Sequence, residues 1–280
     1  FISSGHTVVE GALLQWFKET YQQEPQERRG LGGDYWLWEY PDYAKNYMVV
    51  ADVARGDGGD YSTFHVIDVE TVTQVAEYKG QVSTKDFGNM LVNAATEWNN
   101  ALLVIENANV GWAAIQVAID REYTNLYYTY KHEGVTDYDI AMDKGYDLKD
   151  KSQMVPGFTT SSRTRPLLIS KLDIYFREKD CVVRSKRLLD EMFVFIWNGS
   201  KAEAQQGYND DLVMAFAIAL FVRDTALKLR QHGLDLNRAA LSSMGNAKTK
   251  SVYTTQNNHV PGVWDVEMGG HNEDLTWLLK

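Results

Sequence analysis

Short apolar runs separated by turn-forming residues dominate the first third of the chain. Residues 49–53 are rich in β-branched side chains and contain no turn former, which predicts a strand buried on both faces. A glycine-rich reversal follows at residues 55–60, and residues 62–69 then alternate with a period of two. Residues 73–79 are a third extended segment. The pattern predicts an antiparallel meander of three strands, the first of which carries an acid, Asp52.

Helical and extended patterns alternate after this meander. Ser83 is a predicted N-cap, with Asp86 three residues further on, and apolar residues recur at helical spacing as far as Trp98. Residues 102–106 predict a strand, residues 111–121 a helix, and residues 126–131 a fifth strand. Three consecutive strands followed by helical crossovers predict an α/β fold, a mixed sheet with a meander and parallel strands flanked by helices.

The later part of the chain predicts one long loop and two substantial helices. Residues 134–157 are polar and contain glycine, and their length indicates a functional loop. Residues 160–179 predict a helix, and residues 181–183 and 192–197 predict short extended segments. Residues 202–209 are polar and predict a flexible connection. Residues 212–230 predict a helix that is apolar almost all round, which must therefore be buried against the sheet.

These elements predict one domain at residues 47–230 with an extension at each end. Residues 1–46 have little periodicity apart from a short helix at residues 11–23, which favours an arm or linker. Residues 231–280 predict a tail that is either a docking segment or disordered. The chain starts without a methionine or a signal-peptide pattern, so we expect it to be a piece of a longer protein.

Composition narrows the class of protein. The 280 residues are 44% hydrophobic, which is typical of a folded globular protein. Cys181 is the single cysteine, which excludes an internal disulfide framework. The longest apolar run, residues 212–222, is shorter than the ~20 residues that a membrane-spanning helix needs. We therefore expect no membrane partner.

The balance of charge restricts how the protein could bind nucleic acid. A formal net charge of -10 argues against a protein that coats nucleic acid, because phosphate binding depends on Lys and Arg. A nuclease is not excluded, since metal-binding carboxylates make a site acidic until cations bind. A basic strip at residues 163–187 includes Arg163, Arg165 and Lys171, which are candidate DNA contacts. A solvated helix face is an equally good interpretation of each of them.

Acidic residues stand at the ends of the predicted core elements. Asp52 lies in the first strand and Glu106 closes another apolar strand, while Asp210 and Asp211 open the late apolar helix. One acid at a helix start is best explained as an N-cap, but two adjacent acids exceed that need. Asp60, in the glycine-rich turn, is either an outer member of this group or a cap of its own turn.

Carboxylates that converge in this way repel one another unless cations join them. Hard oxygen ligands suit Mg²⁺ or Mn²⁺, and two such ions activate water and stabilise the leaving 3′ oxygen in phosphodiester hydrolysis. The chain contains no Cys and His grouping with zinc spacing and no Gly-x-x-x-x-Gly-Lys-Ser/Thr loop. The chemistry predicted from the residues is therefore metal-assisted hydrolysis without a phosphate-binding loop of the ATPase type.

Three motifs carry a resemblance to a known family. The sequences VADVARG at residues 50–56 with DYS at residues 60–62, VIENAN at residues 104–109, and GYNDDLVMA at residues 207–215 occur in that order. Together they resemble the nuclease domain of the large terminase subunit of tailed bacteriophages. The resemblance implies a ribonuclease H-like fold and a metal-dependent endonuclease that cuts concatemeric double-stranded viral DNA during packaging.

The resemblance also implies site residues, partners and a place of action. Asp52, Glu106 and Asp211 would form the metal-binding triad, with Asp210 beside it. The resemblance leaves open whether Asp210 or Asp211 is the principal ligand. The implied partners are a terminase ATPase domain, which these residues do not include, the small terminase subunit and the portal protein. The implied location is the host cell cytoplasm, on the procapsid. Apart from the resemblance, the length and polarity of residues 134–157 lead to the hypothesis that this loop gates the DNA groove.

Two functions of other classes remain open at the level of sequence. An acid on a strand before a glycine-rich turn also occurs in actin-like and sugar-kinase ATPases, which need a second similar lobe. The other alternative is a non-catalytic DNA clamp or portal-docking module that keeps the fold. Retention of Asp52, Glu106 and Asp211 argues against that alternative, because a protein that only binds gains nothing from burying acids.

Overall fold

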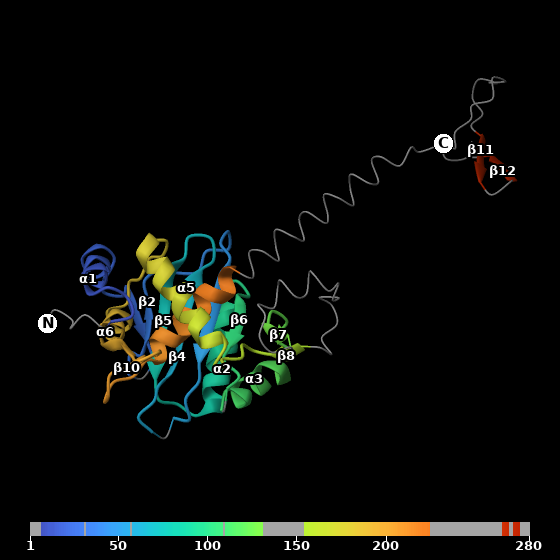
Figure 1. Ribbon diagram of the computed structural model, residues 1–280. Coiled ribbons are helices and arrows are strands. Elements are labelled where there is room, and N and C mark those ends of the chain that lie inside the picture. Colours follow the sequence, from blue (N-terminus) through green and yellow to red (C-terminus); the bar gives the residue numbers. More distant parts are fainter. Residues whose placement is uncertain are drawn as a thin grey trace. The chain divides into compact units, whose positions relative to one another are not determined.

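The computed structural model describes residues 7–224 except 31, 57, 109 and 131–153, together with residues 265–268 and 271–274. The chain divides into two compact units, Phe1–Leu229 and Arg230–Lys280 (Figure 1). The second unit contains an antiparallel pair of strands, β11 (Asp265–Met268) and β12 (His271–Asp274). The first unit contains the main sheet and the helices packed on it.

A six-stranded mixed sheet organises the first unit. Its spatial order is β1-β2-β5-β4-β3-β6, and only the β3–β6 pair is parallel. The strands are β1 (Glu27–Arg29), β2 (Tyr35–Leu37), β3 (Tyr47–Asp52), β4 (Ser62–Asp68), β5 (Thr73–Gly80) and β6 (Leu102–Ile105). The predicted meander is therefore β3, β4 and β5, and it occupies the middle of the sheet.

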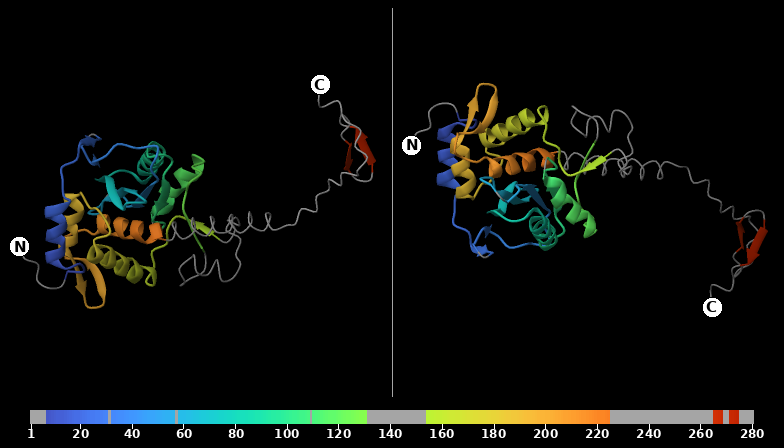
Figure 2. Two further views of the ribbon diagram at one scale, coloured as in Figure 1. Left: turned by 90° about the horizontal axis from the view of Figure 1, so that it is seen from above. Right: turned by 90° about the horizontal axis from the view of Figure 1, so that it is seen from below.

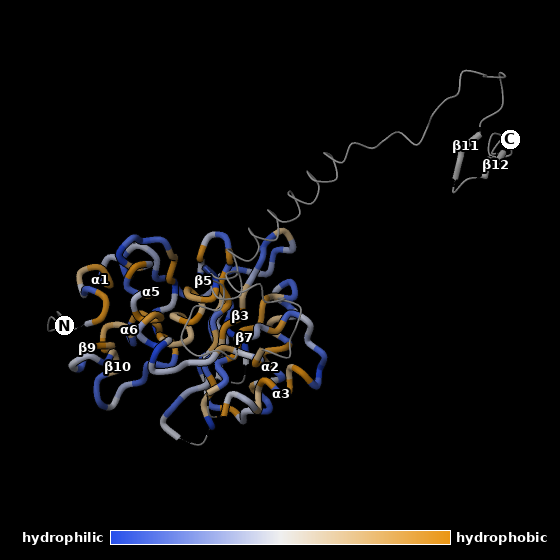
Figure 3. The backbone as a smooth tube through the Cα atoms, turned by 45° about the vertical axis from the view of Figure 1, so that its right-hand side comes forward, coloured by the Kyte–Doolittle hydropathy of each residue, from blue (hydrophilic) through white to orange (hydrophobic). Residues whose placement is uncertain are grey.

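Helices cover both faces of this sheet, which makes three layers (Figure 2). One face packs against α2 (Thr84–Glu97) and α3 (Gly111–Asp120). The other packs against α1 (Gly11–Thr20), α5 (Thr164–Glu178), α6 (Lys186–Val194) and a helix described at residues 211–224. Hydrophobic segments gather in the strands and in the helices packed on them (Figure 3). The described part of the late apolar helix is thus buried against the sheet, as its sequence predicts, and residues 225–230 of the predicted helix lie outside the described residues.

The side chains of β3 alternate between the two cores. Val49 and Ala51 belong to the core under α2 and α3, whereas Met48 and Val50 belong to the core under the helix of residues 211–224. Successive side chains of a strand point to opposite faces. Asp52 therefore has the parity of Val50 and lies on the face that carries the helix of residues 211–224.

Several sequence-based boundaries are confirmed. Strands appear at the three meander positions and at residues 102–105, and helices appear at α2, α3 and α5. The N-cap prediction for Ser83 is confirmed, because its hydroxyl oxygen accepts the Asp86 backbone N–H at 3.1 Å. The predicted loop of residues 134–157 lies largely outside the described residues, which resume with β8 (Met154–Pro156).

The structure corrects four expectations. Residues 1–46 are not simply an arm, because α1 packs in the core through Leu14 and Phe17 while β1 and β2 extend the sheet. The predicted strand at residues 126–131 is found only as β7 (Tyr128–Tyr130), which pairs with β8 in a separate sheet, while Leu126 forms a single parallel bridge with Leu103 of β6 and residue 131 lies outside the described residues. Residues 192–194 end α6, and only β9 (Phe195–Asn198) is extended. Residues 202–204 belong to β10 (Lys201–Ala204), the partner of β9.

Candidate active site

Backbone pairing places Asp52 and Glu106 side by side. Strand β3 pairs in parallel with β6 with Ala51 opposite Ile105, and the Glu106 N–H donates to the Ala51 carbonyl at 3.0 Å. Asp52 and Glu106 come next on their strands, so both carboxyl groups leave the same end of the sheet. Glu106 also has the parity of Val104, which lies in the core beneath the helix of residues 211–224.

A glycine lets helix α3 start directly beside Glu106. A Cβ atom at Gly111 would collide with the carbonyl oxygen of Glu106. Only glycine permits this close approach of the helix start to the strand end. The connection from β6 to α3 is therefore compact, and it encloses the carboxyl end of β6 without a bulky side chain.

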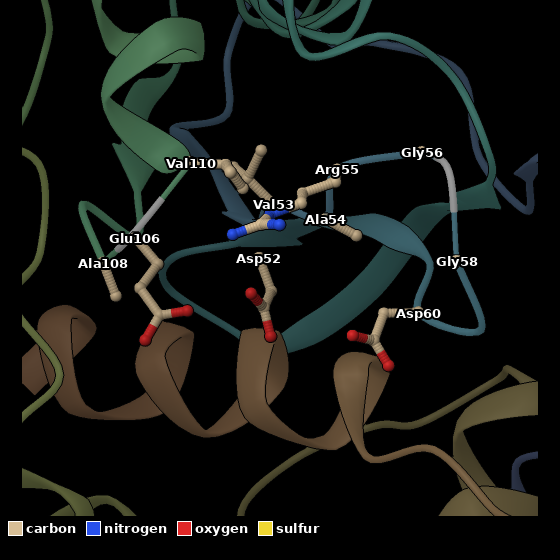
Figure 4. Close-up of a pocket in the computed structure, with 10 residues that line it drawn as sticks. All are labelled: Asp52, Val53, Ala54, Arg55, Gly56, Gly58, Asp60, Glu106, Ala108 and Val110. Atoms are coloured by element: carbon tan, nitrogen blue, oxygen red, sulfur yellow. The ribbon is translucent and has the colours of Figure 1, made fainter.

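A pocket of about 210 Å³ opens at these strand ends. Its lining combines Asp52, Glu106 and Asp60 with residues of the glycine-rich turn and of the segment before α3. The three carboxylates point toward the side on which the helix of residues 211–224 runs (Figure 4). The structure thus brings Asp52 and Asp60, which belong to one hairpin, to the same pocket as Glu106, which follows β6.

The pair formed by Asp52 and Glu106 is electrostatically costly. Burial, followed by the adjacent Glu106 carboxylate, raises the pKa of Asp52 well above its usual range, and Asp211 and Asp210 add to that rise. The carboxyl groups of Asp52 and Glu106 lie close enough to raise the pKa of Asp52 further by sharing a proton, which would require one of them to be protonated. Bound cations would remove the need for that proton, because opposite charge favours the ionised form.

The two aspartates at the start of the late helix have different surroundings. The Asp210 carboxylate forms an ion pair with Arg165 at 2.8 Å. The Asp211 carboxylate instead accepts the Tyr61 N–H at 3.0 Å and a hydrogen bond from Asn209 at 3.3 Å. Burial raises the pKa of Asp211 against these hydrogen bonds, and Asp211 acts on Asp52 more strongly than Asp210 does. The arrangement favours Asp211 as the member of the pair directed at the Asp52 side.

Neither aspartate caps the helix with its side chain. Asp210 occupies the N-cap position, since its carbonyl accepts the Met214 N–H at 2.8 Å, but its carboxylate is paired with Arg165. The Leu212 N–H donates instead to the Glu191 carboxylate of α6 at 3.0 Å. Sequence reasoning missed Glu191, whose only local signal is an acid beside the apolar residues Leu188, Leu189 and Met192 of an amphipathic helix.

Arg55 is a second residue that sequence reasoning missed. It is exposed, lines the pocket, and extends its guanidinium above Asp52 (Figure 4). It is the one cationic side chain among the described residues that line this pocket. Its position beside Asp52 in the VADVARG motif is the signal that could have identified it.

The candidate DNA contacts of the basic strip are engaged within the protein. Arg165 pairs with Asp210, and Lys171 pairs with Asp224 at 2.6 Å. Arg163 is exposed at the N-cap of α5. None of the three lines the pocket at Asp52. The structure does not test their contact with DNA, which stays a prediction.

The donor set at the pocket fits a hard divalent cation. Asp52, Glu106 and Asp60 offer carboxylate oxygens, the ligands that Mg²⁺ prefers, and the strained Asp52–Glu106 pair would gain from a cation. Within the part of the chain that the structure describes, no group of three or more His, Cys, Asp or Glu side chains is already arranged around a common metal position. A complete ligand set therefore requires side-chain adjustment around Asp52 and Glu106.

The fold is that of large terminase nuclease domains. The chain is similar to the large terminase nuclease of thermophilic phage G20c solved with bound magnesium, at 19% identity and a TM-score of 0.56, over 78% of this chain and 97% of that one. It is similar to the nuclease domain of Thermus phage P74-26 at 22% identity and a TM-score of 0.51, over 74% and 93%. The G20c nuclease with bound cobalt gives 20% identity and a TM-score of 0.50.

These comparisons confirm the fold expected from the three motifs. A scan against models of known protein families gives no match. The structural likeness spans 97% of the G20c nuclease chain and 93% of the P74-26 nuclease domain. No helix within the described ranges has the length and apolar character needed to cross a bilayer.

Proposed function

We propose that this chain is a metal-dependent DNA endonuclease of a phage packaging motor. The observation that carries the proposal is the juxtaposition of Asp52 and Glu106 at the ends of two parallel strands, on a fold shared with terminase nucleases. Asp211 stands at the helix start on the same face, and Asp60 lines the same pocket. Two carboxylates held together without a cation weaken the folded state, so their placement side by side is best explained by metal binding.

The residues have distinct roles in the proposed reaction. Asp52 and Glu106 would hold the cations, Asp211 would complete the ligand set, and Asp210 and Asp60 would lie outside it. Two bound Mg²⁺ or Mn²⁺ ions would activate a water and stabilise the leaving 3′ oxygen. Arg55, exposed above Asp52, would contact the scissile phosphate, because a guanidinium binds phosphate oxygens in a fixed bidentate geometry. The Tyr61 N–H and Asn209 would keep Asp211 oriented.

The proposed substrate is concatemeric double-stranded DNA. The proposed partners are the terminase ATPase domain, the small terminase subunit and the portal protein, at the procapsid in the host cytoplasm. The similar nuclease of phage G20c, solved with bound magnesium, cobalt or zinc, supports a nuclease of this type and the use of a divalent metal. Contacts of Arg163, Arg165 and Lys171 with DNA are part of the proposal, and Arg165 and Lys171 would need to exchange their present carboxylate partners.

Cleavage of supercoiled plasmid tests the proposal. The wild-type chain is compared in Mn²⁺, Mg²⁺ and EDTA with Asp52→Asn, Asp211→Asn and the control Asp120→Asn, an exposed acid of α3 away from the pocket. We expect cutting only with metal, its loss in the first two variants, and normal cutting by the control. Cutting in EDTA, or equal cutting by all variants, would contradict the proposal. DNA binding without cutting by any of them would favour the clamp.

A further inference from the structure

A cluster of polar side chains is fully buried between the sheet and the helices that carry the candidate site. Thr63, His65, Gln74 and Glu77 have no exposed surface, although the surrounding core is apolar. Burying polar groups costs free energy unless each finds a partner. A cluster of this kind, directly beneath the start of the helix that bears Asp211, needs an explanation beyond packing.

The hydrogen bonds of Gln74 fix the orientation of the cluster. Its amide oxygen accepts the backbone N–H groups of Arg184 and Ser185, both at 2.9 Å. Its amide nitrogen therefore faces His65 Nδ1 at 3.0 Å and Glu77 at 3.0 Å. Because this nitrogen can only donate, His65 Nδ1 must be the acceptor and the ring hydrogen must sit on Nε2.

Three side chains of the cluster and its surroundings hold the start of the helix at residues 211–224. Thr63 Oγ1 donates to the Asp211 carbonyl at 3.1 Å, and His65 Nε2 donates to the Leu212 carbonyl at 2.9 Å. Glu191 accepts the Leu212 N–H at 3.0 Å. Thr63 of β4 and Glu191 of α6 thus bind the carbonyl and the N–H of the peptide unit between Asp211 and Leu212.

We propose that Glu191, together with Thr63 and His65, is a positioning residue that fixes Asp211 for metal binding. This inference rests on the function proposed above. Glu191 supplies the cap that Ser, Thr, Asp or Asn usually provides from the N-cap position. That position belongs to Asp210, whose carboxylate binds Arg165. Glu191 therefore caps the helix start while Asp210 stays paired with Arg165, and the Asp211 carboxylate keeps its own hydrogen bonds from Tyr61 and Asn209.

Lys79 connects Glu191 to Tyr61, the residue whose backbone N–H binds the Asp211 carboxylate. Its ammonium group pairs with Glu191 and lies 4.6 Å from the centre of the Tyr61 ring. The Tyr61 N–H in turn donates to the Asp211 carboxylate. Mutation of a group that orients a metal ligand typically costs roughly 10- to 100-fold in metal affinity. Glu191 is thus placed to change metal binding without touching the metal.

Mn²⁺ binding to the whole chain, measured by titration calorimetry without DNA, tests the inference. Glu191→Ala removes the cap, Glu191→Gln keeps an oxygen acceptor for the Leu212 N–H, and Asp190→Ala is the control. Asp190 is the adjacent residue of α6, half exposed, and pairs with Lys18 at 3.8 Å. We expect Glu191→Ala to weaken Mn²⁺ binding roughly 10- to 100-fold, with Glu191→Gln and Asp190→Ala close to wild type.

A second variant covers the case in which Glu191→Ala does not fold. Thr63→Val keeps the shape of the side chain but removes the hydroxyl that donates to Asp211, and we expect it to weaken Mn²⁺ binding as well. If a folded Glu191→Ala variant binds Mn²⁺ with wild-type affinity, the positioning role is wrong, while the proposed function still stands. If Glu191→Ala is unfolded, wild-type affinity in Thr63→Val leads to the same conclusion. Failure of the wild-type chain to bind Mn²⁺ would overturn the proposed function and this role together.

Discussion

Asp52 and Glu106 are held together by backbone pairing, not by attraction between their side chains. The Glu106 N–H is bonded to the Ala51 carbonyl, so the backbones of the two residues cannot separate without breaking the sheet register. Burial of Asp52 and the negative charge of Glu106 both favour the protonated form of Asp52. At the scale of single residues, the site therefore stores repulsion that a cation would relieve.

This repulsion gives a prediction for Asp52→Asn. In EDTA we expect the variant to be more stable than wild type by about 1–2 kcal/mol, because a neutral amide no longer faces Glu106 and Asp211. Urea unfolding measures the difference. In saturating Mg²⁺ the order should reverse, since only the wild-type chain gains binding free energy. A variant that is less stable than wild type in EDTA would contradict the stored repulsion.

Glu191 gives a prediction about pH. Burial raises its pKa from the ordinary value of 4.5 to about 7, despite the nearby Lys79. The folded state therefore binds a proton more readily than the unfolded chain. The resulting stabilisation is fully present below about pH 4.5, and up to about 3 kcal/mol is lost as pH rises through 7.

Unfolding in urea at pH 5 and pH 8, without metal, measures this loss. Glu191→Gln lacks the titrating group and should lose less stability between the two pH values than wild type. The pKa values of Asp52 and Asp211 are also raised, so both proteins lose some stability as pH rises for that reason. This part of the pH dependence should be the same in wild type and in Glu191→Gln. Identical pH dependence in the two proteins would contradict the assignment to Glu191.

Residue-level prediction from sequence succeeded where position along the chain carries the signal. Asp52 and Glu106 follow apolar runs, so their place at strand ends could be predicted, and the doubled acid at residues 210–211 marked the helix start. Glu191 could not be predicted in this way, because its partner, the Leu212 N–H, is 21 residues away in the chain. The choice between Asp210 and Asp211 likewise depended on Arg165, which is 45 residues from Asp210.

At the scale of elements, the approach of α3 to β6 is the tightest constraint on the site. Gly111→Ala would force a Cβ atom against the Glu106 carbonyl and displace α3 or the strand end. We expect a loss of about 1–3 kcal/mol of stability and reduced plasmid cleavage. Gly59→Ala is a matched control, because its Cβ would meet nothing within 4 Å. Equal effects of the two changes on stability would contradict the close-approach argument.

Elements were predictable when their own pattern was strong. The apolar meander and the amphipathic α2 follow from their periodicity, and Ser83 marks the start of α2. Strands β1 and β2 have only three residues each, and they are strands because β5 pairs with β2. The polar side chains Thr63 and His65 in β4 are buried because the late helix covers them, which the alternation of β4 alone does not reveal.

At the scale of the whole molecule, the division into two units predicts that the first unit folds independently. A chain truncated after Leu229 keeps the sheet, both cores and every proposed site residue. We expect its unfolding midpoint to stay within roughly 2 °C of the full chain, with metal-dependent cleavage retained, because compact units of this kind fold alone. Thermal unfolding and plasmid cleavage measure both. Loss of cooperative unfolding on truncation would show that the second unit is required.

The central claim is that Asp52 and Glu106 hold a divalent cation. Anomalous scattering from crystals of the chain soaked in Mn²⁺ tests it most directly. We expect a peak between the carboxylates of Asp52 and Glu106, within coordinating distance of both and on the side that faces Asp211. A Mn²⁺ peak held by other side chains, with the Asp52–Glu106 pair left without a metal, would contradict the account.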